Sequence, residues 1–170
     1  MAVLEIVDDC LAPERHIFLT YTGPNPWGVA EKITNLIEPF FHVSASGTGN
    51  DIINWDVVGD QISFYSHWWV KKKFSAHSTM KVDLRIIGKQ HKTTGEGYFR
   101  LRITADLVTQ FSTFGFLLKP LWYLYSYFFY NRIRRRFIER CREMLHRFRD
   151  ELKEHYDLKY TEIPAGAVVG

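Results

Sequence analysis

The stretch that decides the fold is "YFRLRITADL", residues 98–107. Apolar residues stand at every second position from Phe99 to Leu107, and arginine, threonine or aspartate stands between them. Because successive side chains of a β-strand point to opposite faces, this pattern predicts an antiparallel strand with one face on a core and the other in water. We expect the charged residues to form cross-strand ion pairs on the wet face.

The same period of two extends over most of the chain upstream of this stretch. In "MKVDLRI", residues 80–86, apolar residues again alternate with charged ones. The segment "DIINWDVVGDQISFYSHWWVKKKF", residues 51–74, predicts two strands joined by a Gly-Asp turn. The N-terminal segments "VLEIVDD" (3–9) and "RHIFLTYTG" (15–23) are rich in residues that favour strands. An open antiparallel sheet is therefore predicted.

One helical segment interrupts these strands. In "WGVAEKITNLIEPFF", residues 27–41, the apolar residues recur at helical spacing. Asn25 is expected to cap this helix, with Pro26 in its first turn. Pro39 is expected to break or kink it.

A long helix is predicted at the C-terminal end. Apolar residues recur there at spacings of three and four, from Ile133 to Tyr156. Pro120 suits a first turn, so the helix is expected to begin near Lys119. At 1.5 Å per residue it would extend roughly 55 Å, which predicts either a kink near Asn131 or a projecting end.

These elements predict an α+β domain in which a curved antiparallel sheet wraps around the long C-terminal helix, the helix-grip arrangement. Residues 1–160 are expected to form one domain, and residues 161–170 a loose tail. The apolar sheet face needs a cover, and only this helix is long enough to give it. The residues expected to face one another are Phe64, Trp68, Leu84 and Leu101 on the sheet and Trp122, Tyr125, Phe128 and Phe129 on the helix.

The order of elements, together with "GFLLKPLWYLYSYFFYNRIRRRFIERCREMLHRFRDELK" (115–153), resembles the START-like or helix-grip superfamily (SRPBCC). This superfamily includes polyketide cyclase-like, coenzyme Q-binding and Bet v 1-like proteins. The resemblance implies a hydrophobic cavity between sheet and helix that binds or transports an apolar small molecule, such as a lipid, isoprenoid or quinone. It implies no shared catalytic residues and no cofactor. Members usually place two short helices between their first two strands, where this chain offers only residues 25–41.

Polar side chains near the expected cavity are candidates for orienting a ligand. Tyr65, His67 and Tyr125 are expected to have this role. Tyr65 and His67 also allow an alternative hypothesis, a cyclase- or dehydratase-like enzyme in which both face the cavity and transfer a proton. Which face of the strand they occupy stays open. The sequence contains no GxSxG, P-loop, GxGxxG, HExxH or CxxC motif.

The stretch "FGFLLKPLWYLYSYFFYNRIRRR", residues 114–136, allows a second function. It is too short and too interrupted for a membrane span, which needs about 20 mostly apolar residues. Apolar residues at 114–118 followed by a basic cluster fit reversible attachment to an anionic membrane. An alternative for the basic helix is docking on RNA, but the aromatics precede the arginines instead of interleaving with them, which disfavours a nucleic-acid partner. The expected contacts with an anionic surface are Arg132, Arg134, Arg135 and Arg136.

The two cysteines, Cys10 and Cys141, lie far apart in the sequence. This spacing predicts neither a disulfide framework nor a CxxC metal site, and hence a reduced, cytoplasmic location. The alternative function on an anionic membrane would place the protein at the periphery of that membrane. The first sixteen residues contain acids where a signal peptide needs basic and apolar runs. The seven histidines lack metal-ligand spacing, so no metal site is expected. The oligomeric state is left open.

Overall fold

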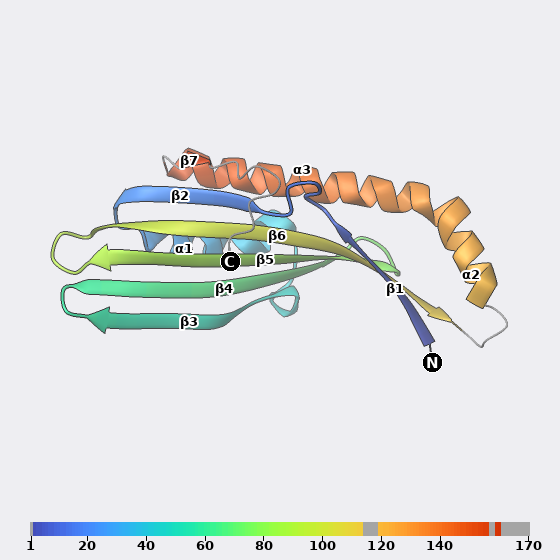
Figure 1. Ribbon diagram of the computed structural model, residues 1–170, viewed down its shortest axis with the longest axis horizontal. Coiled ribbons are helices and arrows are strands. Elements are labelled where there is room, and N and C mark those ends of the chain that lie inside the picture. The colour runs from blue at the N-terminus through green and yellow to red at the C-terminus, as the bar shows by residue number, and fades with distance from the viewer. Residues whose placement is uncertain (1, 114–118, 157–158, 161–170) are drawn as a thin grey trace.

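A computed structural model describes residues 2–113, 119–156 and 159–160 of the protein (Figure 1). The described strands are β1 (Ala2–Asp9), β2 (Ile17–Pro24), β3 (Thr48–Val58), β4 (Gln61–Lys73), β5 (Ser78–His91), β6 (Glu96–Thr113) and β7 (Lys159–Tyr160). The helices are α1 (Gly28–Phe41), a short 3-10 turn (Ala45–Gly47), α2 (Lys119–Tyr125), a π-helical segment (Ser126–Tyr130) and α3 (Asn131–His155). The predicted α+β class, with an open, curved antiparallel sheet and a long C-terminal helix packed on it, is confirmed. The predicted tail lies outside the described residues.

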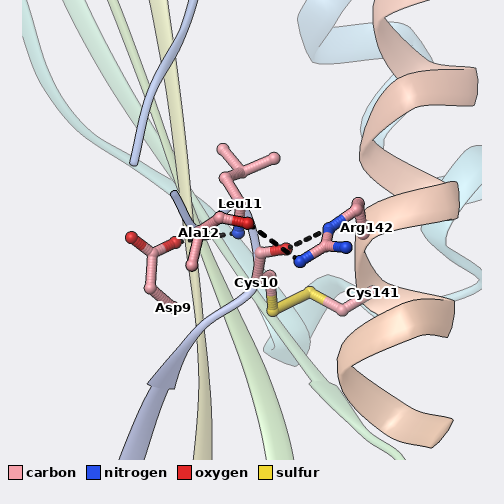
Figure 2. The surroundings of a disulfide bond; sticks show 6 residues. All are labelled: Asp9, Cys10, Leu11, Ala12, Cys141 and Arg142. Atoms are coloured by element: carbon pink, nitrogen blue, oxygen red, sulfur yellow. Dashed lines mark hydrogen bonds between the residues drawn. A yellow bond between two sulfur atoms is a disulfide. The ribbon is translucent and has the colours of Figure 1, made fainter. Parts of the chain in front are cut away.

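The long strand β6 organises the sheet, whose strand order is β3-β4-β5-β6-β2-β7. The first half of β6 pairs with β2, from Glu96 to Ile103. Its second half pairs with β1, from Asp106 to Thr113. Strands β1 and β2 therefore lie one after the other along the same neighbour. The connection between them, residues 10–16, leaves the sheet edge and reaches α3 (Figure 2).

A disulfide joins this connection to α3, between Cys10 and Cys141 (Figure 2). Their Cα atoms are 5.9 Å apart although 131 residues separate them in sequence. Next to the disulfide, Arg142 Nε and Nη2 donate to the carbonyl oxygens of Cys10 and Ala12 at 3.2 and 2.9 Å. The prediction of unpaired cysteines was therefore wrong. The expected cytoplasmic location loses the support that it took from them.

The core lies between one face of the sheet and two helices. The four sheet residues expected there, Phe64, Trp68, Leu84 and Leu101, are at most 2% exposed. Helix α1 was not expected to share the cover, yet it does. Trp68 Nε1 donates to Thr34 Oγ1 at 3.1 Å, and the ring of Phe64 packs edge-on against Trp27. The buried face of α3 consists of Cys141, Met144, Leu145, Phe148 and Leu152.

Helix α1 differs from the sequence prediction at both ends. It begins at Gly28, and Trp27 occupies the cap position without a side-chain cap hydrogen bond. Asn25, the predicted cap, instead forms a turn with a positive φ of 48°. Pro39 lies inside the last turn, and the helix continues to Phe41. Proline has no N–H to donate to the carbonyl of Asn35, so the helix loses one backbone bond at this point and ends two residues later.

Within the described residues, the C-terminal helix begins at Lys119, where the sequence predicted its start. Its π-helical segment, Ser126–Tyr130, stands directly before Asn131, where the sequence predicted a kink. A π-helical turn inserts extra backbone and so changes the helix direction. Figure 1 shows α2 turned away from the line of α3, at the end of the molecule where β1 and β6 meet.

Candidate functional site

The structure separates the residues that were expected to enclose a ligand. Tyr125, Phe128 and Phe129 are 46%, 65% and 70% exposed, and they do not lie opposite the buried residues of β4, β5 and β6. The predicted juxtaposition was wrong because the second half of α3, together with α1, occupies that place. Trp122 belongs to α2, and its side chain lies outside the described part of the molecule. Binding of an apolar small molecule stays a prediction.

The two polar candidates of β4 lie on the other side of the sheet. Phe64, Ser66 and Trp68 are buried, so the alternation of the strand places Tyr65 and His67 on the outward face, away from α1 and α3. From that face neither side chain can reach a space between sheet and helix. The arrangement that the enzyme hypothesis required is therefore not present.

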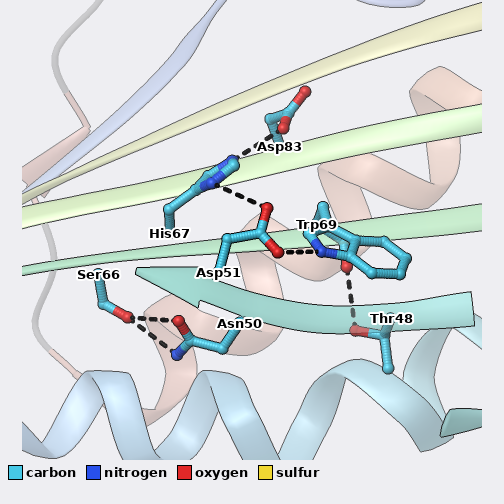
Figure 3. A network of polar contacts seen from close by, with 7 residues as sticks. All are labelled: Thr48, Asn50, Asp51, Ser66, His67, Trp69 and Asp83. Carbon is cyan, nitrogen blue, oxygen red and sulfur yellow. Dashed lines mark hydrogen bonds and ion pairs between the residues drawn. The ribbon is translucent and has the colours of Figure 1, made fainter. Parts of the chain in front are cut away.

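His67 belongs to a polar network on the outward face (Figure 3). Its Nε2 lies 2.9 Å from Asp83 Oδ1, and its Nδ1 lies 3.7 Å from Asp51 Oδ2. Asp51 Oδ1 accepts a hydrogen bond of 2.6 Å from Trp69 Nε1. Asp51 reaches this face because the register of β3 and β4 shifts between Asn50 and Ile52, which is a β-bulge. The network ties β3, β4 and β5 together.

The largest exposed apolar surface on the helices lies on α2 and the π-helical segment, residues 119–130, which we call the aromatic segment. Three consecutive residues, Tyr127, Phe128 and Phe129, are 65–71% exposed. Their rings pack on one another: Tyr127 lies edge-on to Phe128 with centroids 5.4 Å apart, and Phe129 stacks on Tyr125 at 5.9 Å. Its other exposed apolar residues are Leu121, Tyr123, Leu124 and Tyr125.

The aromatic segment is attached to the sheet at its C-terminal end. Tyr130 is buried there, and its hydroxyl lies 2.7 Å from Ser78 Oγ and 3.0 Å from Ser75 Oγ. Its ring packs edge-on against Phe111, with centroids 5.1 Å apart. A further hydroxyl contact of 3.2 Å connects Ser78 to Thr109. These contacts fix the point from which the exposed rings project.

The four arginines predicted to contact an anionic surface divide into two groups. Arg132, Arg135 and Arg136 are exposed on the first turns of α3. Arg134 turns toward the sheet, where its Nε lies 3.1 Å from Asp8 Oδ2. Neither of these two buried atoms has a hydrogen-bond partner, so their contact is between charges without hydrogen-bond geometry. The basic cluster therefore offers three guanidinium groups to a partner, and the fold uses the fourth.

Much of this surface was not predicted from the sequence. Leu121, Tyr123, Leu124 and Tyr127 were not among the predicted contacts, and neither was Asp8. The available signal was the run "YSYFFY", since no amphipathic helix can bury so many adjacent rings against one sheet. Among the described residues, no helix is long and apolar enough to cross a membrane, and no three metal-ligating side chains cluster together.

Comparisons with known proteins give no family for this chain. No family model matches it, and no curated protein matches its sequence. A solved structure titled delta-endotoxin matches with 5% identity and a TM-score of 0.31. The match covers 68% of this chain and 64% of that one, so the chain spans less than two thirds of it. A likeness this weak supports no conclusion about fold or function.

Proposed function

We propose that this protein is a peripheral membrane-binding domain. The aromatic segment would enter the interface of a lipid bilayer, and Arg132, Arg135 and Arg136 would contact anionic headgroups. The observation that carries the proposal is the exposure of seven apolar side chains on 119–130, directly before three exposed arginines. Apolar insertion next to a basic cluster is the two-signal pattern of reversible membrane attachment.

The exposed apolar area is too large for a surface without a partner. A Phe or Tyr side chain has about 150–250 Å² to bury, so seven residues roughly half exposed present on the order of 700 Å². Monomeric soluble proteins rarely expose a contiguous patch of more than a few hundred Å². An interaction that removes these side chains from water is therefore expected.

The form of the segment favours a bilayer over another protein. Three consecutive exposed residues, Tyr127, Phe128 and Phe129, cannot all face one side of a helix, so a flat protein surface would leave part of this apolar area in water. A helix lying in the headgroup region is surrounded by lipid on most sides. Tyr123, Tyr125 and Tyr127 also carry hydroxyl groups, and aromatic rings with a polar tip are enriched at the level of the headgroups.

The arginines add an electrostatic contribution that depends on the lipid. A basic residue near an anionic surface contributes about 1 kcal/mol, so three exposed arginines contribute about 3 kcal/mol, or roughly a 100-fold increase in binding. Arg134 is left out of this sum because Asp8 already neutralises it. Binding should therefore need anionic lipid and should weaken as salt increases.

Co-sedimentation with lipid vesicles tests the proposal. The protein should bind vesicles containing phosphatidylserine and bind pure phosphatidylcholine much less. Phe128→Ala with Phe129→Ala should lower the partition coefficient roughly 10-fold or more, at about 1 kcal/mol per partly inserted ring. The control is Val58→Ala, because Val58 is also an exposed apolar residue, 69%, but lies beside the β3–β4 turn.

The charges are tested separately. Changing Arg132, Arg135 and Arg136 together to Gln should remove the preference for phosphatidylserine, whereas Lys89→Gln on β5 should keep it. Light scattering of the wild-type protein tests the alternative, that a second copy of the chain covers this surface. If the wild type is a dimer that becomes monomeric in the double Phe variant, and neither binds vesicles, the aromatic segment is a self-association surface and the proposal is wrong.

The helix-grip shape supports a second part of this proposal, that the protein is START-like and carries an apolar small molecule. A sheet face covered by α1 and α3 is consistent with that architecture. A carrier that takes its ligand from a bilayer needs a membrane-binding surface, so the two functions are compatible. Native mass spectrometry of the protein from its own host, followed by organic extraction, would detect a retained lipid, isoprenoid or quinone. A mass equal to that of the chain alone would count against the cargo and leave membrane binding in place.

A further inference from the structure

The outward face of the sheet contains two like charges directly opposite one another. In the register of β5 and β6, Arg85 pairs with Arg102. We propose that these two arginines bind a phosphate group on the outward face of the sheet. This site is separate from the aromatic segment, so its test is independent of membrane binding.

The pairing of Arg85 with Arg102 is unfavourable in the absence of an anion. Residues directly opposite in an antiparallel pair have Cβ atoms about 4.5–5.5 Å apart, and like charges at this distance destabilise the sheet. The sequence pattern predicted cross-strand ion pairs on this face. One row fits that expectation, because Lys81 lies opposite Asp106. The cross-strand pair of Arg85 and Arg102 does not fit it, because both residues are positively charged.

The nearest carboxylates are engaged elsewhere. Asp83 lies on the outward face two residues before Arg85, but its Oδ1 contacts His67 Nε2. Asp51 contacts both His67 and Trp69 (Figure 3). Within the part of the chain that the structure describes, neither Arg85 nor Arg102 forms an ion pair or a side-chain hydrogen bond. Both guanidinium groups are therefore available to an external anion.

The surroundings of Arg102 orient the site. Phe18 of β2 lies opposite Arg102, and the guanidinium of Arg100 stacks over the Phe18 ring at 4.4 Å. Arg102 is half-buried and Arg85 is exposed, so one donor is held by its neighbours while the other is open to solvent. Burial lowers the pKa of His16, and the positive charge of Arg102 lowers it further.

The chemistry of two guanidinium groups favours a phosphate over a carboxylate. Each guanidinium presents a planar fork of donors, and two forks from neighbouring strands can divide the oxygens of a tetrahedral anion between them. Two positive charges match a phosphate monoester, which carries nearly two negative charges at neutral pH. A single carboxylate would leave one positive charge without compensation.

Thermal unfolding in inorganic phosphate, compared with chloride at the same ionic strength, tests the site. Phosphate should raise the midpoint of the wild type, and the rise should grow with the logarithm of the concentration above the dissociation constant, because a ligand that binds only the folded state stabilises it by RT ln(1 + L/Kd), where L is the concentration of free phosphate. Arg85→Gln should weaken the apparent affinity at least 10-fold. Lys89→Gln, on the same strand and face, is the matched control and should respond like the wild type. In chloride alone, Arg85→Gln should be more stable than the wild type, because a repulsion has been removed.

Two further experiments measure the pKa of His16 and identify the kind of molecule that carries the phosphate group. The pKa of His16, followed by NMR, should rise when phosphate binds to the wild type and should not change in Arg85→Gln. Vesicles containing phosphatidic acid, compared with soluble glycerol phosphate, show whether the phosphate group belongs to a lipid or to a free molecule. The proposal is overturned if phosphate shifts the midpoints of Arg85→Gln and Lys89→Gln equally, or if Arg85→Gln is less stable than the wild type in chloride.

Discussion

The disulfide between Cys10 and Cys141 should account for a large part of the stability of the fold. It closes a loop across a separation of 131 residues. In the chain-entropy description a loop of this length constrains the unfolded state by about 5 kcal/mol at 25 °C. Domains of this size are typically stable by about 5–15 kcal/mol in total, so the disulfide is worth a third of the stability or more.

The perturbation is the double substitution Cys10→Ala and Cys141→Ala. Alanine suits both sites because both sulfurs are fully buried and a hydroxyl there would lack a partner. Urea unfolding followed by tryptophan fluorescence should show a free energy of unfolding lower by about 3–5 kcal/mol. The slope against urea should increase, since the unfolded chain without the crosslink exposes more surface. Wild type unfolded and refolded with a reductant present is the chemical control.

The prediction is wrong if the free energy of unfolding of the double variant is lower by less than about 1 kcal/mol, which is what an ordinary substitution costs. It fails equally if both thiols of the purified, unreduced protein react with a thiol reagent. The hydrogen bonds from Arg142 to the carbonyl oxygens of Cys10 and Ala12 remain in the variant. The effect of the disulfide can therefore be separated from that of these hydrogen bonds. Arg142→Gln in the oxidised protein removes the hydrogen bonds and leaves the loop closed.

Two further predictions concern single groups. Tyr130→Phe removes the hydroxyl that contacts Ser75 and Ser78, and should lower the free energy of unfolding by about 1–2 kcal/mol, measured by urea unfolding, with Tyr123→Phe as an exposed control. Burial lowers the pKa of His16 and of His146 below the ordinary 6.5, so the unfolded chain binds protons more readily. Their contribution to stability is complete above pH 6.5 and is lost as the pH falls through the lowered values; a urea midpoint that does not change on acidification from pH 7 would contradict this.

Local pattern was enough to predict most of the elements. The alternation around Leu84 and Leu101 placed both residues correctly in the core, because a strand has only two faces and one of them was apolar throughout. The start of the last helix at Lys119 and the change of geometry before Asn131 also followed from local signals, a proline and the length of the pattern. Each of these depends on neighbours within a few residues.

The errors concern contacts between distant segments. The disulfide depends on where the connection after β1 leaves the sheet, which no local pattern around Cys10 indicates. The pairing of Arg85 with Arg102 depends on the register of two strands, and a shift of two residues in one direction would have placed Thr104 opposite Arg85 instead. The aromatic segment was expected on the core because its rings are apolar. The core was already filled by residues of α1 and α3.

The three attachments of the last helix explain why the aromatic segment stays exposed. Tyr130, Arg134 and Cys141 are four and seven residues apart, so they lie near one face of the helix and hold that face against the sheet. A helix fixed in this way cannot slide or rotate to bury the rings of residues 121–129 without breaking a disulfide, an ion pair or a buried hydroxyl contact. Exposure of these rings therefore follows from how the helix is held. The same attachments would keep the segment in position when it enters a bilayer, so that little ordering of the chain would oppose binding.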